Sequence, residues 1–511
     1  MAFEMEAFMG ALSVVFALDT FLFILIGVII GISFGAIPGL AHTMPIAIAL
    51  PLTLVLPIHQ SMGLLIGTYK GGTYGGSITA ISFATPGTSG AAATVADGYA
   101  LTKLGKGKKA LQMALYSSIF GDSISDIALI FLVIPIGMVA PDFGPAELTA
   151  LYIMALSLVV ILAADNPGKG FISAGVGFFL AVIGRDVVTG TLRFGFGIRE
   201  LQAGFSLIPF LMGFFAVPEI VRQMRKVFVN PESVENLGEG SAEELKEEEG
   251  LTFKELLSSW RGLSIGTFLG IFLGALPGPG ATLSSYTSYS VVGQFTKDKD
   301  YGKGSLEGVA AAESANNATC GATFIPMLTF GIPGSSIAAM LMAALIMEGI
   351  PVGPRVMVDH TETVYILFLL LLLANPFNFI MGKILIPVYT RLTKLPARFL
   401  WPAISVLLVM GTYAYNNRPF DVVIMIISGV IGCFFYWFKI SDGPLVLAFL
   451  VAPFFEQNFR QALLISGGDY GYFLQSNISR VLWLVTLASL IWFFWKKIKN
   501  GHEEPEMRVS D

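Results

Sequence analysis

The sequence predicts an all-α polytopic membrane protein with about 10–12 transmembrane helices, two inverted repeats, and helices that are broken or re-entrant at Pro-Gly motifs. Composition is the first reason: 54% of the 511 residues are hydrophobic and 13% are charged, whereas soluble domains carry roughly 25% charged residues. The second reason is a series of long apolar runs. The third is a pair of polar Pro-Gly breaks, one in each half of the chain.

Apolar segments recur from one end of the chain to the other, and about 20 apolar residues suffice for one bilayer crossing. The clearest runs lie at 21–36, 127–139, 364–374, 422–438 and 481–495. No basic region precedes the first run, so we expect an uncleaved first helix. Lys496, Lys497 and Lys499 favour a cytoplasmic C-terminus. Cys320 and Cys433 show no disulfide or metal-binding spacing.

The first half begins with a helix from about residue 18, which we expect to be interrupted at 36–40. Pro38 removes a backbone hydrogen bond there and clashes with the preceding turn. The next segment, 67–77, holds five glycines and is too Gly-rich for a stable lipid-facing helix, so it should be buried or line a cavity. We expect Lys70 to extend to a membrane interface; the alternative is that it offers positive charge to an anionic ligand.

The first Pro-Gly break, Pro86-Gly87, comes next. Thr88 or Ser89 can cap a new helix after it, whose free N–H groups and dipole would favour an anion. A loop with four lysines follows at 103–109, and such basic loops are typically cytoplasmic.

The helices after this loop look like scaffold. Within them, Asp122 and Asp126 have helical spacing. They are either proton or cation sites, or residues at an interface or facing water.

A single strongly hydrophilic run, 230–250, divides the chain. It is acidic and lacks aromatic residues, which is typical of an exposed, flexible linker. It separates a first membrane repeat, 1–229, from a second, 251–500, and a polar tail follows at 501–511. We expect the site-forming parts at 20–102 and 260–350, and the scaffold parts at 110–226 and 361–498.

The two halves repeat a sequence pattern. GIFLGALPG at 270–278 matches GISFGAIPG at 31–39 without a gap, and PGSS at 333–336 matches PGTS at 86–89. Two matches in the same order indicate an internal duplication. Basic residues favour an inverted one, because the lysines follow the break in the first half and precede it in the second. Corresponding loops then have opposite basic bias, as inverted repeats require.

A polar run lies beside the second break, within two helical turns: Glu313, Ser314, Asn316, Asn317 and Thr319. Amide carbonyls, hydroxyls and freed backbone carbonyls are hard oxygen ligands that suit Na⁺. A sodium site at Asn316 and Asn317 is therefore the favoured hypothesis. Glu313 as a proton carrier is the alternative, because burial of a carboxyl group favours its neutral form. A purely structural hydrogen-bond cluster between helices is the third possibility.

Together these motifs resemble the large membrane subunit of tripartite tricarboxylate transporters over nearly the whole chain. The motifs that carry the resemblance are 31–39, Tyr74-Gly75-Gly76-Ser77, Pro86-Gly87 with Asp97-Gly98, 270–278, 307–318, 331–335 and 349–354. The chain departs from the family pattern at Lys70, where relatives usually carry an uncharged residue, and at Ala312, where Pro is common. These departures concern the choice of substrate.

The resemblance implies the translocating subunit of an ion-gradient-driven carboxylate importer, not an enzyme, in a prokaryotic plasma membrane. It implies two partners, a small membrane subunit and a periplasmic solute-binding protein, with Na⁺ or H⁺ as coupling cation. It implies no cofactor and no ATP site, in agreement with the lack of a G-x-x-x-x-G-K-S/T motif. Nothing indicates a nucleic-acid partner.

The alternatives are a stand-alone carboxylate transporter, a passive channel and a membrane-embedded enzyme. The last would use Glu313 with Asn316 or His42, but the sequence has no paired-His metal motif and no activated-nucleophile signature.

The predicted substrate site combines the two breaks. N–H groups and hydroxyls at two facing half-helix N-termini would hold carboxylates without a permanent arginine; hydroxyls that only cap helices are the alternative. The predicted substrate-binding residues are Gly39, Thr43, Gly87, Thr88, Ser89, Gly278, Gly334, Ser335 and Ser336. We expect the site-forming parts to move as a core against the scaffold helices.

Overall fold

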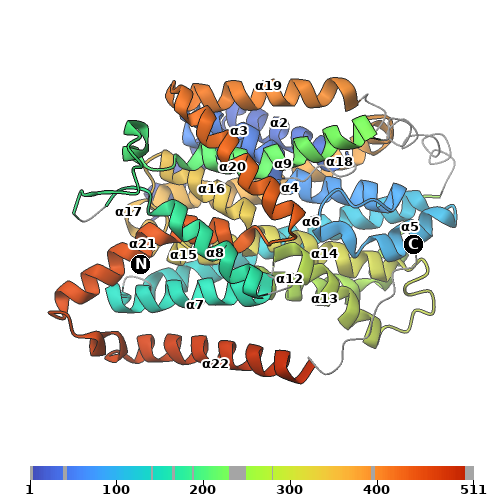
Figure 1. The fold of residues 1–511 in the computed structure, drawn as a ribbon. Coiled ribbons are helices and arrows are strands. Elements are labelled where there is room, and N and C mark those ends of the chain that lie inside the picture. Colours follow the sequence, from blue (N-terminus) through green and yellow to red (C-terminus); the bar gives the residue numbers. More distant parts are fainter. Residues whose placement is uncertain are drawn as a thin grey trace.

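The computed structural model describes residues 4–37, 43–139, 142–163, 167–186, 189–229, 249–278, 280–392 and 397–500. Most of them are helical (Figure 1), which confirms the all-α prediction. In these ranges the regular strands are β1 (Gly184–Arg185) and β2 (Leu192–Arg193), which pair antiparallel. The predicted tail at 501–511 and all but the last two residues of the predicted linker lie outside the described residues.

The described helices divide between the two halves of the chain. The first half contains α1 (Met5–Val15), α2 (Leu18–Gly35), α3 (Thr43–Ala49), η1 (Leu50–Leu54), α4 (Ile58–Phe83), η2 (Gly90–Ala92), α5 (Val95–Lys103), α6 (Gly107–Val139), α7 (Pro145–Ala163), α8 (Pro167–Ala181), η4 (Arg199–Ala203) and α9 (Leu207–Val229). The second half contains α11 (Phe253–Ser258), α12 (Trp260–Gly274), α13 (Gly280–Phe295), α14 (Leu306–Ala322), α15 (Phe324–Phe330), α16 (Ser336–Met347), α17 (Val356–Asp359), α18 (Thr361–Leu392), α19 (Ala397–Asn416), α20 (Pro419–Trp437), α21 (Gly443–Ile465), η7 (Tyr470–Leu474) and α22 (Asn477–Asn500).

Five of the described helices are long and apolar enough to cross a bilayer: Leu18–Gly35, Gly107–Val139, Leu207–Arg225, Thr361–Ile384 and Pro419–Trp437. Shorter apolar helices accompany them. Peripheral helices such as α19 and α22 (Figure 1) expose large apolar side chains, among them Met410 and Leu484. A multi-pass membrane protein accounts for this surface, because lipid replaces water around it. The total of about 10–12 crossings stays a prediction.

The glycine-rich segment at 67–77 lies inside α4 and is buried along its whole length, as predicted. Glycines let α2 approach α4 backbone to backbone. A Cβ atom on Gly31 would lie 2.3 Å from the carbonyl oxygen of Thr68, closer than any real contact. Such close packing stabilises helix pairs in membranes and offsets the cost of glycine in a helix.

The second half repeats this packing. A Cβ atom on Gly270 of α12 would lie 2.5 Å from the carbonyl oxygen of Ala315 in α14, as one on Gly31 would meet α4. The two Pro-Gly breaks also make matching close contacts. A Cβ atom on Gly87 would lie 2.1 Å from the Gly35 carbonyl oxygen, and one on Gly334 would lie 3.0 Å from that of Gly274. The sequence match therefore corresponds to a match in contacts.

α4 and α14 contact each other in the interior of the molecule. The Cys320 thiol lies 3.5 Å from the Thr73 hydroxyl, and the Ser77 hydroxyl donates to Glu313 Oε2 at 2.6 Å. Residue numbers rise along one helix as they fall along the other, so the two helices run antiparallel. α6 packs against α14, and α18 packs against α4.

The two breaks differ in the helix that follows each of them. α2 ends at Gly35, as the expected interruption requires, although 38–42 lie outside the described residues. After the first break the backbone turns helical at Ser89, first as the three-residue 3-10 helix η2 and then as α5 from Val95. Thr88 Oγ1 accepts a hydrogen bond from the Ala91 N–H, so Thr88 caps this start as predicted. At the second break Ser335 caps α16, a helix of 12 residues.

Candidate functional site

Both Pro-Gly breaks border one pocket of about 770 Å³. The first break contributes Pro86 to Ser89 and the second contributes Pro333 to Ser336. Of the predicted substrate-binding residues, those that line it are Thr43, Gly87, Thr88, Ser89, Gly278, Gly334, Ser335 and Ser336. Gly39 lies outside the described residues. The structure thus brings together residues that are almost 250 positions apart in the chain.

The pocket is lined mainly by hydroxyl and backbone groups. Further hydroxyls come from Tyr69, Thr73, Thr282, Tyr286, Thr319 and Ser441. Its arginine, Arg222 on α9, donates to Glu219 Oε1 at 2.7 Å, and Glu219 also borders the pocket. Sequence reasoning missed this pair, together with Asp442, although charged residues close to an apolar run were a usable signal. Arg222 is thus already paired with a carboxylate, and the other side-chain donors that line the pocket are neutral hydroxyls.

Two of the predicted hydroxyl oxygens accept hydrogen bonds from backbone N–H groups. Ser335 Oγ accepts a hydrogen bond from the Ala338 N–H at 3.1 Å, and Thr88 Oγ1 accepts one from the Ala91 N–H at 3.3 Å. A hydroxyl that accepts a cap hydrogen bond still has its O–H available as a donor. The capping alternative and a ligand contact are therefore compatible at both positions.

The predicted ion-coupling residues lie in different surroundings. The Glu313 carboxylate is buried among hydroxyls and accepts from Ser77, Thr94 and Ser118. Asn317 Nδ2 donates to Ser118 Oγ at 2.8 Å. Two more have other neighbours: Ser314 donates to the Gly262 carbonyl oxygen at 3.3 Å, and Thr319 lines the pocket.

Asn316 differs from its neighbours. It is buried, and neither atom of its side-chain amide has a hydrogen-bond partner among the described residues. The same holds for Asn317 Oδ1. Asn316 Oδ1 points at η2 of the first break, where a Cβ atom on Gly90 would lie 2.1 Å from it. Buried amides without partners are rare and costly, so these two carbonyl oxygens are candidates to hold a cation.

Both expectations for Lys70 are wrong. Its side chain is completely buried and neither extends to an interface nor lines the pocket. Lys70 Nζ lies 2.6 Å from Asp126 Oδ2, 3.5 Å from Asp122 Oδ1 and 2.7 Å from Asn375 Oδ1. The two aspartates are accordingly buried and do not face water. A lone lysine and an acidic pair at membrane depth could have indicated this pairing, because buried charges need partners.

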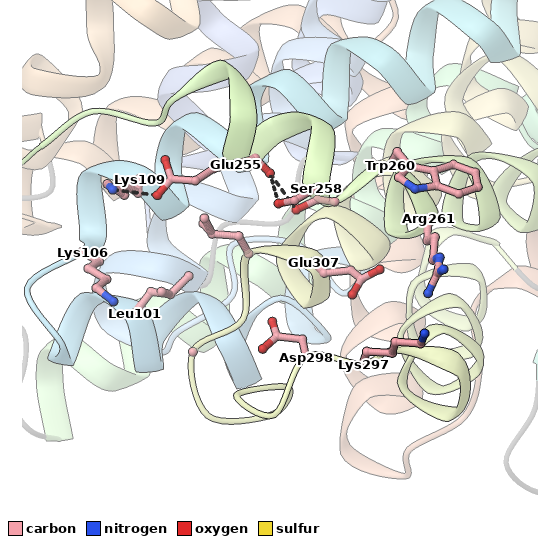
Figure 2. Close-up of a pocket in the computed structure, with 13 residues that line it drawn as sticks. Leu101, Lys106, Lys109, Glu255, Ser258, Trp260, Arg261, Lys297, Asp298 and Glu307 are labelled. Carbon is pink, nitrogen blue, oxygen red and sulfur yellow. Dashed lines mark hydrogen bonds and ion pairs between the residues drawn. The ribbon is translucent and has the colours of Figure 1, made fainter.

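A second pocket, of about 570 Å³, lies where the two lysine-containing loops meet (Figure 2). Lys106, Lys109 and Lys297 line it together with Glu255 and others. The Lys109 ammonium lies 2.7 Å from Glu255 Oε1 and lowers the pKa of Glu255 to about 2. None of the predicted site residues borders this pocket.

Asp97 ties the two halves together near the second pocket. Its Oδ1 accepts from the backbone N–H groups of Gly304 and Ser305, both at 2.8 Å. Its Oδ2 accepts from the Tyr289 hydroxyl at 2.9 Å. The loop after α5 and the loop before α14 therefore lie at the same end of the molecule.

Comparison with known proteins places the chain in a family. The model of the tripartite tricarboxylate transporter TctA family matches residues 21–447. An uncharacterized 52.8 kDa protein in the TAR-I ttuC' 3' region of Agrobacterium vitis is 34% identical over 483 residues, 94% of this chain and 94% of that relative. An uncharacterized protein in the TAR-II ttuC' 3' region of the same organism is 35% identical over 236 residues, 46% of this chain and 98% of the relative. The chain belongs to the tripartite tricarboxylate transporter TctA family and is a membrane transport component, not an enzyme.

Proposed function

We propose that this chain is the translocating subunit of an ion-gradient-driven importer of organic tri- or dicarboxylates, which a periplasmic solute-binding protein delivers. The observation that carries the proposal is the pocket that both Pro-Gly breaks share. A small membrane subunit completes the assembly in the prokaryotic plasma membrane, with the C-terminus in the cytoplasm. A stand-alone carboxylate transporter and a channel are the competing functions.

Substrate carboxylates bind to neutral donors at the breaks. The first turn of α16 presents backbone N–H groups without intrahelical partners, and Ser335 and Ser336 add hydroxyls. Thr88 and Ser89 approach from the other break. Neutral donors suit a transporter, because a permanently charged pocket would retain an anion that has to leave.

The antiparallel contact of α4 and α14 supports the inverted arrangement of the two repeats. The repeated contacts of Gly31 and Gly270 support the same arrangement. Inverted repeats supply two related conformations of one fold, each open to one side of the membrane. The shared pocket lies between the repeats, where such an exchange would alternate its access.

For the coupling ion we propose Na⁺ at the carbonyl oxygens of Asn316 and Asn317. Both oxygens lack partners among the described residues. Thr319, three residues along the same helix from Asn316, lines the pocket and donates to the Asn316 backbone carbonyl. A cation held there would lie close to the substrate and compensate its negative charge. A proton on Glu313 is the competing mechanism.

Uptake into proteoliposomes tests this function. The vesicles contain the chain with its small membrane subunit, the binding protein is added outside, and sodium and proton gradients are imposed separately. We expect uptake to require sodium and the binding protein, and Asn316→Ala to raise the half-saturating sodium concentration about tenfold, equivalent to losing about 1.4 kcal/mol of binding. Asn458→Ala, which removes an amide outside the pocket, is the matched control.

Three results would each reject one of these assignments. Uptake that a proton gradient drives without sodium, and that Glu313→Gln abolishes, would replace sodium by a proton on Glu313. Uptake that needs no binding protein would favour the stand-alone transporter, and flux that never exceeds equilibration would favour the channel.

A further inference from the structure

A buried polar cluster lies outside the substrate pocket. Lys70 of α4, Asp122 and Asp126 of α6, and Asn375 of α18 converge there, and each side chain is at most 3% exposed. Neither the pocket nor the sodium candidates use these groups. The cluster joins three helices that belong to both halves of the chain.

The two aspartates are not equivalent. Asp126 Oδ2 receives the Lys70 ammonium at 2.6 Å and the Asn375 amide at 2.8 Å. Asp122 has no hydrogen bond on either oxygen among the described residues, and its nearest cation is Lys70 Nζ at 3.5 Å. Lys70 thus pairs most closely with Asp126, although Asp126 Oδ1 also lacks a hydrogen bond, and Asp122 shares the same ammonium at the longer distance without a hydrogen bond of its own.

The charges around Asp122 do not balance. One ammonium faces two carboxylates, which leaves one negative charge. From α14, Cys320 faces the cluster with a neutral thiol, and Glu313 is held by hydroxyls further along that helix. α18 contributes amides, since its Lys383 is exposed. α15 carries no charge, and Arg261 of α12 and Asp97 of α5 contact other residues. Burial of an uncompensated charge is costly.

One proton removes this imbalance better than a metal ion. Sodium requires several converging oxygens, but Lys70 and Asn375 present N–H donors to the cluster. The ammonium 3.5 Å from Asp122 would repel a second cation. A proton on Asp122 needs no coordination shell and leaves the Lys70–Asp126 pair intact.

We propose that Asp122 is a proton-binding site whose occupancy changes during transport. Lys70 connects it to the substrate pocket, because its neighbours Tyr69 and Thr73 on α4 line that pocket. When α4 shifts against α6 and admits water to the cluster, the O–H bond of the Asp122 carboxyl group breaks, the proton passes to that water, and the approaching Lys70 ammonium stabilises the carboxylate that is left. This step rests on the proposed transport function and adds a proton to it as a second coupled ion.

The proton itself is detectable without any transport assay. Infrared spectra of the purified wild-type protein at pH 7 should show the carbonyl stretch of a protonated, water-excluded carboxylic acid. Spectra of Asp122→Asn under the same conditions should lack that band. Asn resembles a protonated Asp in shape and charge, so this variant should fold normally. Asp421→Asn, which alters a buried aspartate outside the cluster, should retain the band. Equal bands in the wild type and Asp122→Asn would overturn the proposal.

Transport measurements test the coupling. In proteoliposomes, Asp122→Asn should still exchange internal for external carboxylate. The extra accumulation that a proton gradient adds should be at least tenfold smaller than in the wild type. Asp421→Asn alters a buried aspartate that is hydrogen-bonded by Ser206 and Asn416, and it should keep both activities. An unchanged proton effect in Asp122→Asn would show that the proton is not coupled. Wild-type vesicles that exchange no carboxylate would instead reject the transport function, and the infrared result would stand independently.

Discussion

Lys70→Met is expected to lower the free energy of unfolding by about 3–5 kcal/mol, because removal of one partner leaves a buried charge uncompensated. Lys70 is completely buried, and its ammonium lies 2.6 Å from Asp126 Oδ2. Methionine has a similar length but no charge. The measurement is the midpoint of thermal unfolding in detergent, together with the fraction of protein that elutes as a single species.

A double variant separates lost charge from lost packing. Lys70→Met combined with Asp126→Asn removes both members of the pair, and we expect it to recover most of the stability. Lys103→Met, which removes a lysine that lies over the Tyr99 ring near the end of α5, is the control and should change stability little. If Lys70→Met unfolds at the wild-type temperature, the cluster does not hold α4, α6 and α18 together.

Gly31→Leu is expected to separate α2 from α4. A Cβ atom at this position would lie 2.3 Å from the Thr68 carbonyl oxygen and 2.7 Å from the Gly72 nitrogen. Backbone atoms cannot rotate aside as a side chain can, so the helices must move apart. Overpacking typically costs 1–3 kcal/mol, and we expect the upper end of about 3 kcal/mol here, with loss of carboxylate uptake.

Gly175→Leu is the matched control for this substitution. Gly175 lies in α8, where an added Cβ atom meets nothing within 4 Å. Both substitutions raise the helix propensity by a similar amount, so only Gly31→Leu should lose thermal stability and uptake. Equal behaviour of the two variants would mean that the close contact between α2 and α4 is not required.

Much of the site could be predicted because its signals are local in sequence. A Pro-Gly break cannot remain in a lipid-facing helix, and the duplicated motif predicts two such breaks. That Thr88 and Ser335 border the same pocket agrees with this reasoning. The burial of 67–77 followed from its glycines in the same way.

The remaining features depend on pairings between distant segments. Lys70 is separated from Asp126 by 56 residues and from Asn375 by 305, so its own sequence context resembled that of an interfacial lysine. The pairing of Arg222 with Glu219 is local, but its position on the pocket depends on how α9 packs.

Protection of cysteines by substrate tests the central claim most directly. Ser89→Cys and Ser336→Cys each place a thiol in the pocket, one at either break, while Ser258→Cys places one in the second pocket (Figure 2). Cys433, the more accessible native cysteine, is replaced by Ser in all three. We predict that a transported tri- or dicarboxylate slows alkylation at positions 89 and 336 at least fivefold and leaves position 258 unchanged. Alkylation rates at 89 and 336 that no transported carboxylate alters would contradict a substrate site between the two breaks.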